Sequence, residues 1–210
     1  MTTYQRTLWL GVAFAAALSC WRAPFPRQMY LQHLPTVVLL LILPFAVRRY
    51  AFSNVAFTGI ILLMLFHVLG ARYIYSYVPY DVWSERLFGI NLTKRFGFRR
   101  NHYDRVVHFA FGLFAVRPAW EILTGPGRVP PRLARYLAIE FVLAFSLLYE
   151  LFEWGLTMVL SPADAGAYNG EQGDIWDAHR DMSLALLGGC LALIIWAMAR
   201  LLTPSAAASR

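Results

Sequence analysis

The stretch that decides the fold is GEQGDIWDAHRDMSLALLGGCLALIIWAMARLL, residues 170–202, in which an acidic segment leads directly into an apolar one. A helix needs about 20 residues to cross the hydrocarbon core of a bilayer, and residues 182–202 meet that length. If the helix begins within the acidic segment, Asp174, Asp177 and Asp181 project within roughly 60° of one another. Three clustered carboxylates repel one another unless a cation, a proton or a basic partner offsets their charge. The stretch therefore predicts a membrane helix with a polar site at its N-terminal end.

The composition of the whole chain is typical of a membrane protein. Hydrophobic residues make up 59% of the chain and charged residues 15%, whereas a soluble domain carries about 25% charged residues. The net charge of +7 comes from 18 arginines and one lysine. These gather between apolar segments, where membrane topology and anionic headgroups explain them better than nucleic acid does. The two cysteines form no CxxC pair, so neither a disulfide framework nor a zinc cluster is predicted.

Six apolar segments predict an all-α, polytopic membrane helical bundle of about six transmembrane helices, in one integral-membrane domain over residues 1–210. The segments are residues 7–21, 31–47, 50–69, 103–123, 133–156 and 182–202. In the long third connection, Trp83, Leu87 and Ile90 recur at helical spacing, so a short interfacial helix is expected there. The tyrosines expected at headgroup depth in that connection are Tyr73, Tyr75, Tyr77 and Tyr80.

The basic residues also predict how the bundle is oriented. Six crossings put both termini on one side of the membrane. With that side inside, the short connections and tails carry nine cations inside and three outside, which favours cytoplasmic termini. The long third connection and the start of the fourth segment add seven cations outside, and these argue against that orientation.

In such a bundle, four segment ends share one membrane face, whichever side is outside. They are the end of the third segment, the start of the fourth, the end of the fifth and the start of the sixth. The ionisable residues at these ends are His67, His102, Asp104, His108, Glu150, Glu153, Asp174, Asp177 and Asp181. Such residues in or beside bilayer segments are costly and usually face a bundle interior or a wet cavity. We therefore expect a shared polar pocket.

Two pairs in this set are the candidate catalytic residues. Asp104 and His108 are four residues apart, so the carboxylate can raise the proton affinity of the imidazole or orient it as a metal ligand. A local ion pair is the simpler interpretation of these two. Glu150 and Glu153 are three apart in an apolar helix, so both can point inward, either for function or in a buried network. Glu121 lies near the opposite face and is expected to pair locally.

Four motifs carry most of these residues: HxxGAxYxYxxVP at 67–79, RNHYDRxxHF at 100–109, YExxEW at 149–154 and QGDxWDxxxDM at 172–182. Together they resemble the YjdF-like bacterial inner-membrane proteins. The resemblance covers about residues 65–189 and implies a multi-pass fold in the bacterial inner membrane, without a catalytic assignment. His179 stands where the family pattern leads us to expect Gln. The final acidic helix is also distantly similar to VanZ-like membrane proteins.

The first functional hypothesis is a membrane enzyme with a divalent metal. Asp174, Asp177 and Asp181 are the candidate metal ligands, and the wider set from which the ligands could come also includes Glu150, Glu153, Asp104 and His108. An oxygen-rich set with one or two imidazoles suits Mg²⁺, Mn²⁺ or Zn²⁺. Such an ion could act on a lipid-linked or anionic substrate in the bilayer. The candidate ligands of the anionic headgroup are Arg99, Arg100 and Arg105. No nucleophile elbow or HExxH motif supports this hypothesis.

Two alternatives remain open. The chain could be a proton- or cation-coupled transporter in which the carboxylates and His108 exchange ions. Glu140 lies deeper in its segment than Glu150 and would extend a polar path, or it could pair locally. The chain could also be a non-catalytic membrane protein whose polar network holds the helices in place.

Overall fold

A computed structural model describes residues 1–202, apart from the side chains of residues 162–164 and 167. Within this part of the chain there are ten helices and no strand, so the all-α class is confirmed. The end of the expected domain, residues 203–210, lies outside the described residues.

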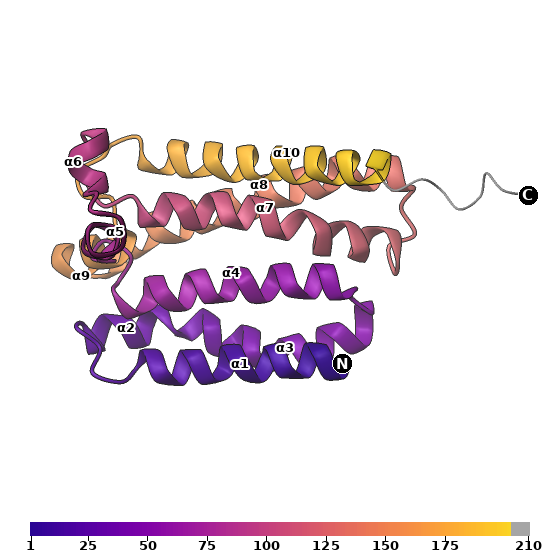
Figure 1. The fold of residues 1–210 in the computed structure, drawn as a ribbon, viewed down its shortest axis with the longest axis horizontal. Coiled ribbons are helices and arrows are strands. Elements are labelled where there is room, and N and C mark those ends of the chain that lie inside the picture. The colour runs from indigo at the N-terminus through magenta and orange to yellow at the C-terminus, as the bar shows by residue number, and fades with distance from the viewer. Residues whose placement is uncertain (203–210) are drawn as a thin grey trace, which may run out of the picture.

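Six long helices run side by side along the long axis of the molecule (Figure 1). They are α1 (Thr3–Ser19), α3 (Leu34–Tyr50), α4 (Asn54–Arg72), α7 (Tyr103–Thr124), α8 (Pro131–Val159) and α10 (Asp177–Leu202). Each contains most of one predicted apolar segment. The observed ends lie in the polar flanks because capping residues are found there: the side chain of Thr2 caps α1 and that of Ser53 caps α4.

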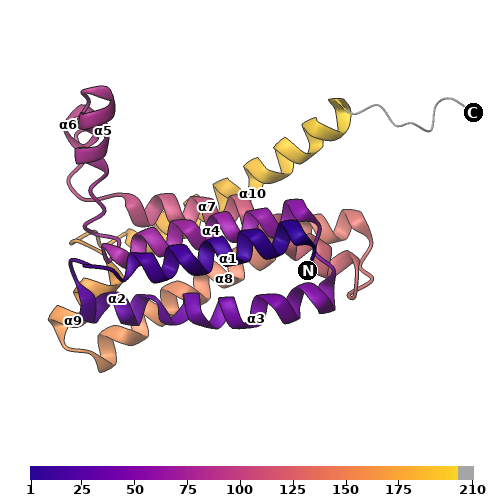
Figure 2. The same ribbon diagram turned by 60° about the horizontal axis from the view of Figure 1, so that its bottom comes forward.

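Four short helices lie in the connections at one end of the bundle (Figures 1 and 2). They are α2 (Pro26–Gln32), α5 (Tyr80–Phe88), α6 (Leu92–Phe96) and α9 (Pro162–Asn169). A helix is therefore present where the sequence predicts one in the third connection. The sequence predicts only a connector where α9 is found, because no hydrophobic period marks that stretch.

Four helical stretches of the described chain are long and apolar enough to cross a membrane. They are Pro26–Tyr50, Asn54–Arg72, Tyr103–Thr124 and Asp177–Leu202. The other two long helices, α1 and α8, are not among these four. α1 has only 17 residues, about 25 Å at the usual rise per residue, and α8 contains five charged residues.

The central helix is α7, which packs against α4, α8 and α10. It approaches α10 very closely because glycines lie at the crossing. A Cβ atom added to Gly112 would lie 1.9 Å from the carbonyl oxygen of Ala185, and one added to Gly188 would lie 2.1 Å from that of Phe109. Small residues let two helix backbones come this close.

The crossing also determines where the polar residues of both helices lie. α7 and α10 begin at the same end of the bundle (Figure 1). His108 and Asp104 precede the α7 glycine by four and eight residues, and Asp181 and Asp177 precede the α10 alanine by the same intervals. Because residues four apart share a helix face, the close approach brings these four side chains together.

The opposite end of the bundle contains a smaller polar group. Glu121 accepts hydrogen bonds from Nε of Arg117 at 2.6 Å and from the N–H and hydroxyl of Ser53 at 2.8 and 2.6 Å. The Arg117 guanidinium lies 5.0 Å from the ring centre of Trp120 and 4.5 Å from that of Trp196. The local pairing expected for Glu121 is confirmed.

Candidate functional site

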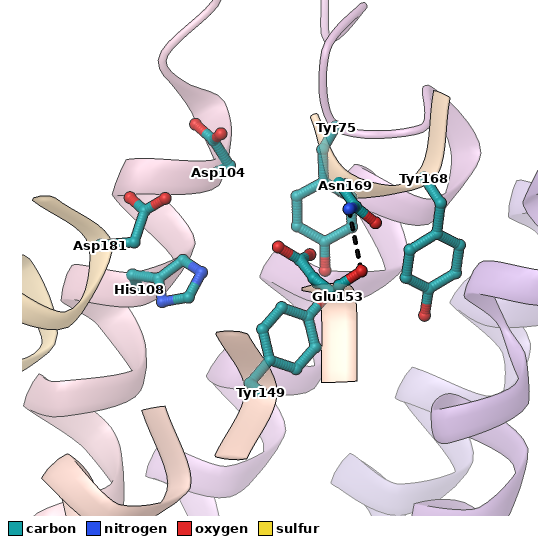
Figure 3. A pocket seen from close by; sticks show the side chains of 8 residues that line it. All are labelled: Tyr75, Asp104, His108, Tyr149, Glu153, Tyr168, Asn169 and Asp181. Carbon is teal, nitrogen blue, oxygen red and sulfur yellow. Dashed lines mark hydrogen bonds between the residues drawn. The ribbon is translucent and has the colours of Figure 1, made fainter. Parts of the chain in front are cut away.

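A buried cluster of histidine and acidic side chains lies at the end of the bundle where α7 and α10 begin and α8 ends. α7 contributes Asp104 and His108, α8 contributes Glu150 and Glu153, and α10 contributes Asp181. Asp104, His108, Glu153 and Asp181 are among the residues that line the pocket drawn in Figure 3. The shared polar pocket predicted from the sequence is therefore present.

All members of the cluster except Glu150 line a cavity of about 10 Å³, which is room for about one water molecule or ion. Its lining residues are Tyr75, Asp104, His108, Tyr149, Glu153, Tyr168, Asn169 and Asp181 (Figure 3). The three tyrosines and the asparagine are not among the predicted site residues. Two of the tyrosines lie within the quoted motifs, which is the signal that could have identified them. No such signal marks the other two residues, which belong to α9.

Arg100 is the main basic residue of the site, and its side chain is only 5% exposed. It forms ion pairs with Asp104 and Asp177. It also donates to the carbonyl oxygens of Gly170 at 2.9 Å and Glu171 at 3.0 Å. Asp104 is therefore paired with the arginine four residues before it, and not with the histidine four residues after it as the sequence suggested.

Asp174 lies in a turn ahead of α10, whereas the sequence predicted it on the helix. Its Oδ1 accepts a hydrogen bond from the N–H of Trp176 at 3.1 Å, a local contact that aspartate often forms beside a helix start. Its other oxygen pairs with Arg105 and Arg180. Burial acts to raise the pKa of Asp174, but the Trp176 N–H and the two arginines outweigh it and hold that pKa below its ordinary value.

The predicted substrate-binding arginines are thus in different environments. Arg100 and Arg105 bind carboxylates of this chain, and this occupies them in a way that the sequence did not predict. Arg99 is exposed at the surface. Of the three, it is the one whose charge faces outward.

Three buried carboxylates have no arginine or lysine partner among the described residues, and they are Asp181, Glu150 and Glu153. Oδ1 of Asp181 and Oε1 of Glu150 are buried, and neither accepts a hydrogen bond from any residue the structure describes. Nε2 of His108 lies 3.6 Å from Oε1 of Glu150. One ligand atom from each of His108, Glu150 and Asp181 lies within 4.8 Å of the other two. This arrangement could hold a divalent cation or share protons.

A second acidic set, formed by Asp104, Asp177 and Asp181, has the same compactness. The guanidinium of Arg100 already offsets the first two charges. A cation would have to compete with that buried guanidinium, so the second set is the poorer metal site.

The far wall of the cavity is held by a constrained turn after α4. Nε2 of His67 lies 2.9 Å from the carbonyl oxygen of Gln32, and Nδ1 is hydrogen bonded to the hydroxyl of Tyr75. A carbonyl can only accept, so Nε2 carries the hydrogen and Tyr75 donates to Nδ1. A Cβ atom on Gly70 would lie 2.7 Å from the Tyr75 ring. His67 and Gly70 of the HxxGAxYxYxxVP motif therefore hold the Tyr75 ring in place, the first by a hydrogen bond and the second by leaving room for the ring.

Comparison with known proteins agrees with the motifs. No solved structure matches this chain. The chain is 32% identical over 164 residues to the inner membrane protein YjdF of Escherichia coli strain K12, an alignment that covers 78% of this chain and 74% of that protein. The family described as predicted membrane protein (DUF2238) matches residues 4–201. This chain is therefore a YjdF-like protein and belongs to the DUF2238 family of predicted membrane proteins.

Proposed function

We propose that this chain is a divalent-metal-dependent membrane enzyme whose metal is bound by His108, Glu150 and Asp181. The observation that supports this most directly is the pair of buried carboxylate oxygens, on Glu150 and Asp181, that lack a hydrogen-bond donor among the described residues. An uncompensated buried charge costs several kcal/mol. A bound cation would remove that cost for both groups at once.

The donor set suits such an ion. Two carboxylate oxygens and one imidazole nitrogen are ligands that Mn²⁺ and Zn²⁺ accept readily, and Mg²⁺ would bind them with several waters retained. Of the three aspartates predicted as ligands, only Asp181 is retained in this set. Asp174 and Asp177 are paired with arginines, so they would hold Arg100 and Arg105 in place beside the metal ligands.

A metal bound there would supply Lewis acidity toward a water molecule or a substrate oxygen. Glu153 lines the cavity together with the proposed ligands His108 and Asp181 (Figure 3). It has no basic partner among the described residues, so we assign it the role of general acid or base. Asp104 is held by Arg100 and lies one helical turn from the proposed ligand His108. The site lies at the end of the bundle, where headgroups would be within reach, which favours a lipid-linked or anionic substrate.

The proposal includes six membrane crossings. α1 and α8 run along the same axis as the four apolar helical stretches (Figure 1), and α8 packs against both α7 and α10. The arginine distribution favours cytoplasmic termini, and the name of the Escherichia coli relative favours the inner membrane. Figure 1 views α5 nearly end-on, so this helix crosses the bundle axis as an interfacial helix would.

The two alternatives have less support. A transporter would use Glu140 to extend a polar path, but this residue is exposed on α8. A purely structural network would have its buried groups satisfied, because a partly satisfied one destabilises the fold. The unpaired oxygens of Glu150 and Asp181 do not fit that description.

Metal content of the purified full chain tests the proposal. We expect about one Mn²⁺, Zn²⁺ or Mg²⁺ ion per chain by mass spectrometry after detergent purification, and a loss of about tenfold or more in Glu150→Gln and Asp181→Asn. Glu121→Gln is the matched control, because that carboxylate is paired with Arg117 at the opposite end. Metal-free protein of unchanged helix content, in buffers that supply all three ions, would contradict the proposal.

A further inference from the structure

We infer that the α5–α6 hairpin, residues 80–99, docks on anionic lipid headgroups of the leaflet at the polar end of the bundle. This docking rests on the proposed crossing of the membrane by the long helices, but not on a bound metal. It names a partner for a surface that contributes no ligand to the proposed metal site.

The hairpin is positioned to lie along a membrane surface. It stands away from the long helices (Figure 2), and α5 runs across their common axis (Figure 1). Its base is anchored, because Tyr80 and Trp83 pack against an aromatic cluster of the bundle and the Trp83 ring meets the Tyr73 ring edge-on at 6.0 Å. Within the hairpin, Asp81 accepts a hydrogen bond from the N–H of Thr93 at 2.9 Å. The two helices are therefore held as one unit.

This unit exposes several large apolar side chains. Leu87 and Phe88 are each 73% exposed, and Phe96 is 65% exposed. Val82 and Ile90 are also exposed. Several large exposed apolar side chains on one short element, bordered by charged residues, are typical of a membrane-contact surface. In a chain anchored in a bilayer, the nearest apolar phase for this surface is the acyl region just below the headgroups.

The charges beside these apolar groups are mostly positive. Arg86, Lys94, Arg95 and Arg99 are exposed, and Glu85 is the exposed anion of the described hairpin. This balance is complementary to anionic lipid. A second copy of the same surface would instead bring like charges together. Basic and apolar residues on one short amphipathic element are what binding to an anionic interface requires.

The test places a fluorophore on the hairpin of the full chain. Phe88→Cys, in a background with Cys20→Ser and Cys190→Ser, is labelled and reconstituted in nanodiscs, and quenching by spin-labelled phosphatidylglycerol is compared with quenching by spin-labelled phosphatidylcholine. We expect a clear preference for phosphatidylglycerol that falls as salt is raised. Each removed cation should lower this preference by up to about fivefold.

The variant for this test is the triple substitution Lys94→Gln, Arg95→Gln and Arg99→Gln. Its matched control, Arg48→Gln, Arg128→Gln and Arg132→Gln, removes exposed cations from the opposite end of the bundle. Loss of the preference in the first triple alone supports docking. Equal quenching by the two lipids in the parent, absence of quenching, or equal loss in both triples overturns it. The salt titration of the parent gives the same decision if the first triple does not fold. The metal content is expected to stay unchanged in both triple variants. The metal measurement therefore tests the proposed function, and the quenching measurement tests the docking independently of it.

Discussion

At the end of the bundle where α7 finishes, one largely buried carboxylate is matched by the donors around it, whereas at the end where α7 begins, carboxylates outnumber their partners. Glu121 accepts from Arg117 and twice from Ser53. At the other end, Asp104, Asp174 and Asp177 pair with three arginines. Three further carboxylates have no arginine partner among the described residues, and two of them, Glu150 and Asp181, each retain a buried oxygen without a hydrogen-bond donor there. A satisfied network stabilises a fold, and an unsatisfied one is costly unless something binds to it. The difference separates a structural group from a candidate site.

The largest expected effect concerns the arginines at the two ends. Arg100→Gln should lower the free energy of unfolding by about 3–5 kcal/mol, because Asp104 would be left buried without an arginine partner and Asp177 would keep only its 3.4 Å contact with Arg105. Arg117→Gln should cost about 1–2 kcal/mol, since that side chain is 33% exposed and loses one ion pair and its contacts with two tryptophans. Chemical unfolding in detergent measures both values. Equal losses in the free energy of unfolding would show that the arginine at the polar end stabilises the fold no more than the arginine at the opposite end.

The next largest effect is expected from a substitution that disrupts the packing of α7 against α10 without changing a charged residue. Gly188→Ala should cost about 1–3 kcal/mol, because the new methyl group would overlap the Phe109 carbonyl and force α7 and α10 apart. The metal content of the protein should fall as well, because the contact between Gly112 and Ala185 lies one helical turn after His108 on α7 and after Asp181 on α10. Gly155→Ala on α8 has open space around the added Cβ and should stabilise the protein by up to about 1 kcal/mol. A Gly188→Ala protein with unchanged stability and metal content would refute the role of the crossing.

The meeting of His108, Glu150 and Asp181 could be predicted from the sequence, because alternating helix directions determine which segment ends share a face. The pairings could not. Asp104 lies four residues from Arg100 and four from His108, so helical spacing permits either partner. The choice depends on the approach of α10, which brings Asp177 to the same guanidinium. That approach depends on backbone contact between glycines, which no charge pattern predicts.

The cavity walls were harder to predict for a second reason. Tyr75 is one of several tyrosines expected at headgroup depth. Its ring is buried in a left-handed turn at Ile74 and Tyr75, where its hydroxyl is hydrogen bonded to His67. Tyr168 and Asn169 belong to α9, a short helix without a hydrophobic period. Local sequence carries little information about such elements, because tertiary contacts decide how they pack.

A smaller effect compares two glutamates directly. In metal-free protein, Glu150→Gln should leave the free energy of unfolding unchanged or raise it, because it removes an uncompensated buried carboxylate. Glu121→Gln should lower it by about 1 kcal/mol, because that carboxylate is paired and hydrogen bonded. Both are measured with chelator present. A loss of stability in Glu150→Gln equal to that in Glu121→Gln would indicate that Glu150 belongs to a structural network.

The smallest effect is a pH dependence confined to the polar end. His102 precedes α7, and burial together with the charges of Arg105 and Arg100 lowers its pKa from the ordinary 6.5, although Asp174 acts in the opposite direction. Arg105 donates to Nδ1 of the ring at 2.8 Å, a contact that requires this nitrogen to be unprotonated. The folded state therefore favours the neutral ring.

Because the folded pKa of His102 lies below the unfolded one, its contribution to stability is present above about pH 6.5 and is lost as the pH falls through that value toward the lowered pKa. His102→Gln should flatten this part of the profile of melting temperature against pH. His179→Gln removes an exposed imidazole at the start of α10 and serves as the control. If both variants keep the parent's slope below pH 6.5, other groups cause the acid sensitivity and the arginines around His102 do not repel a proton there.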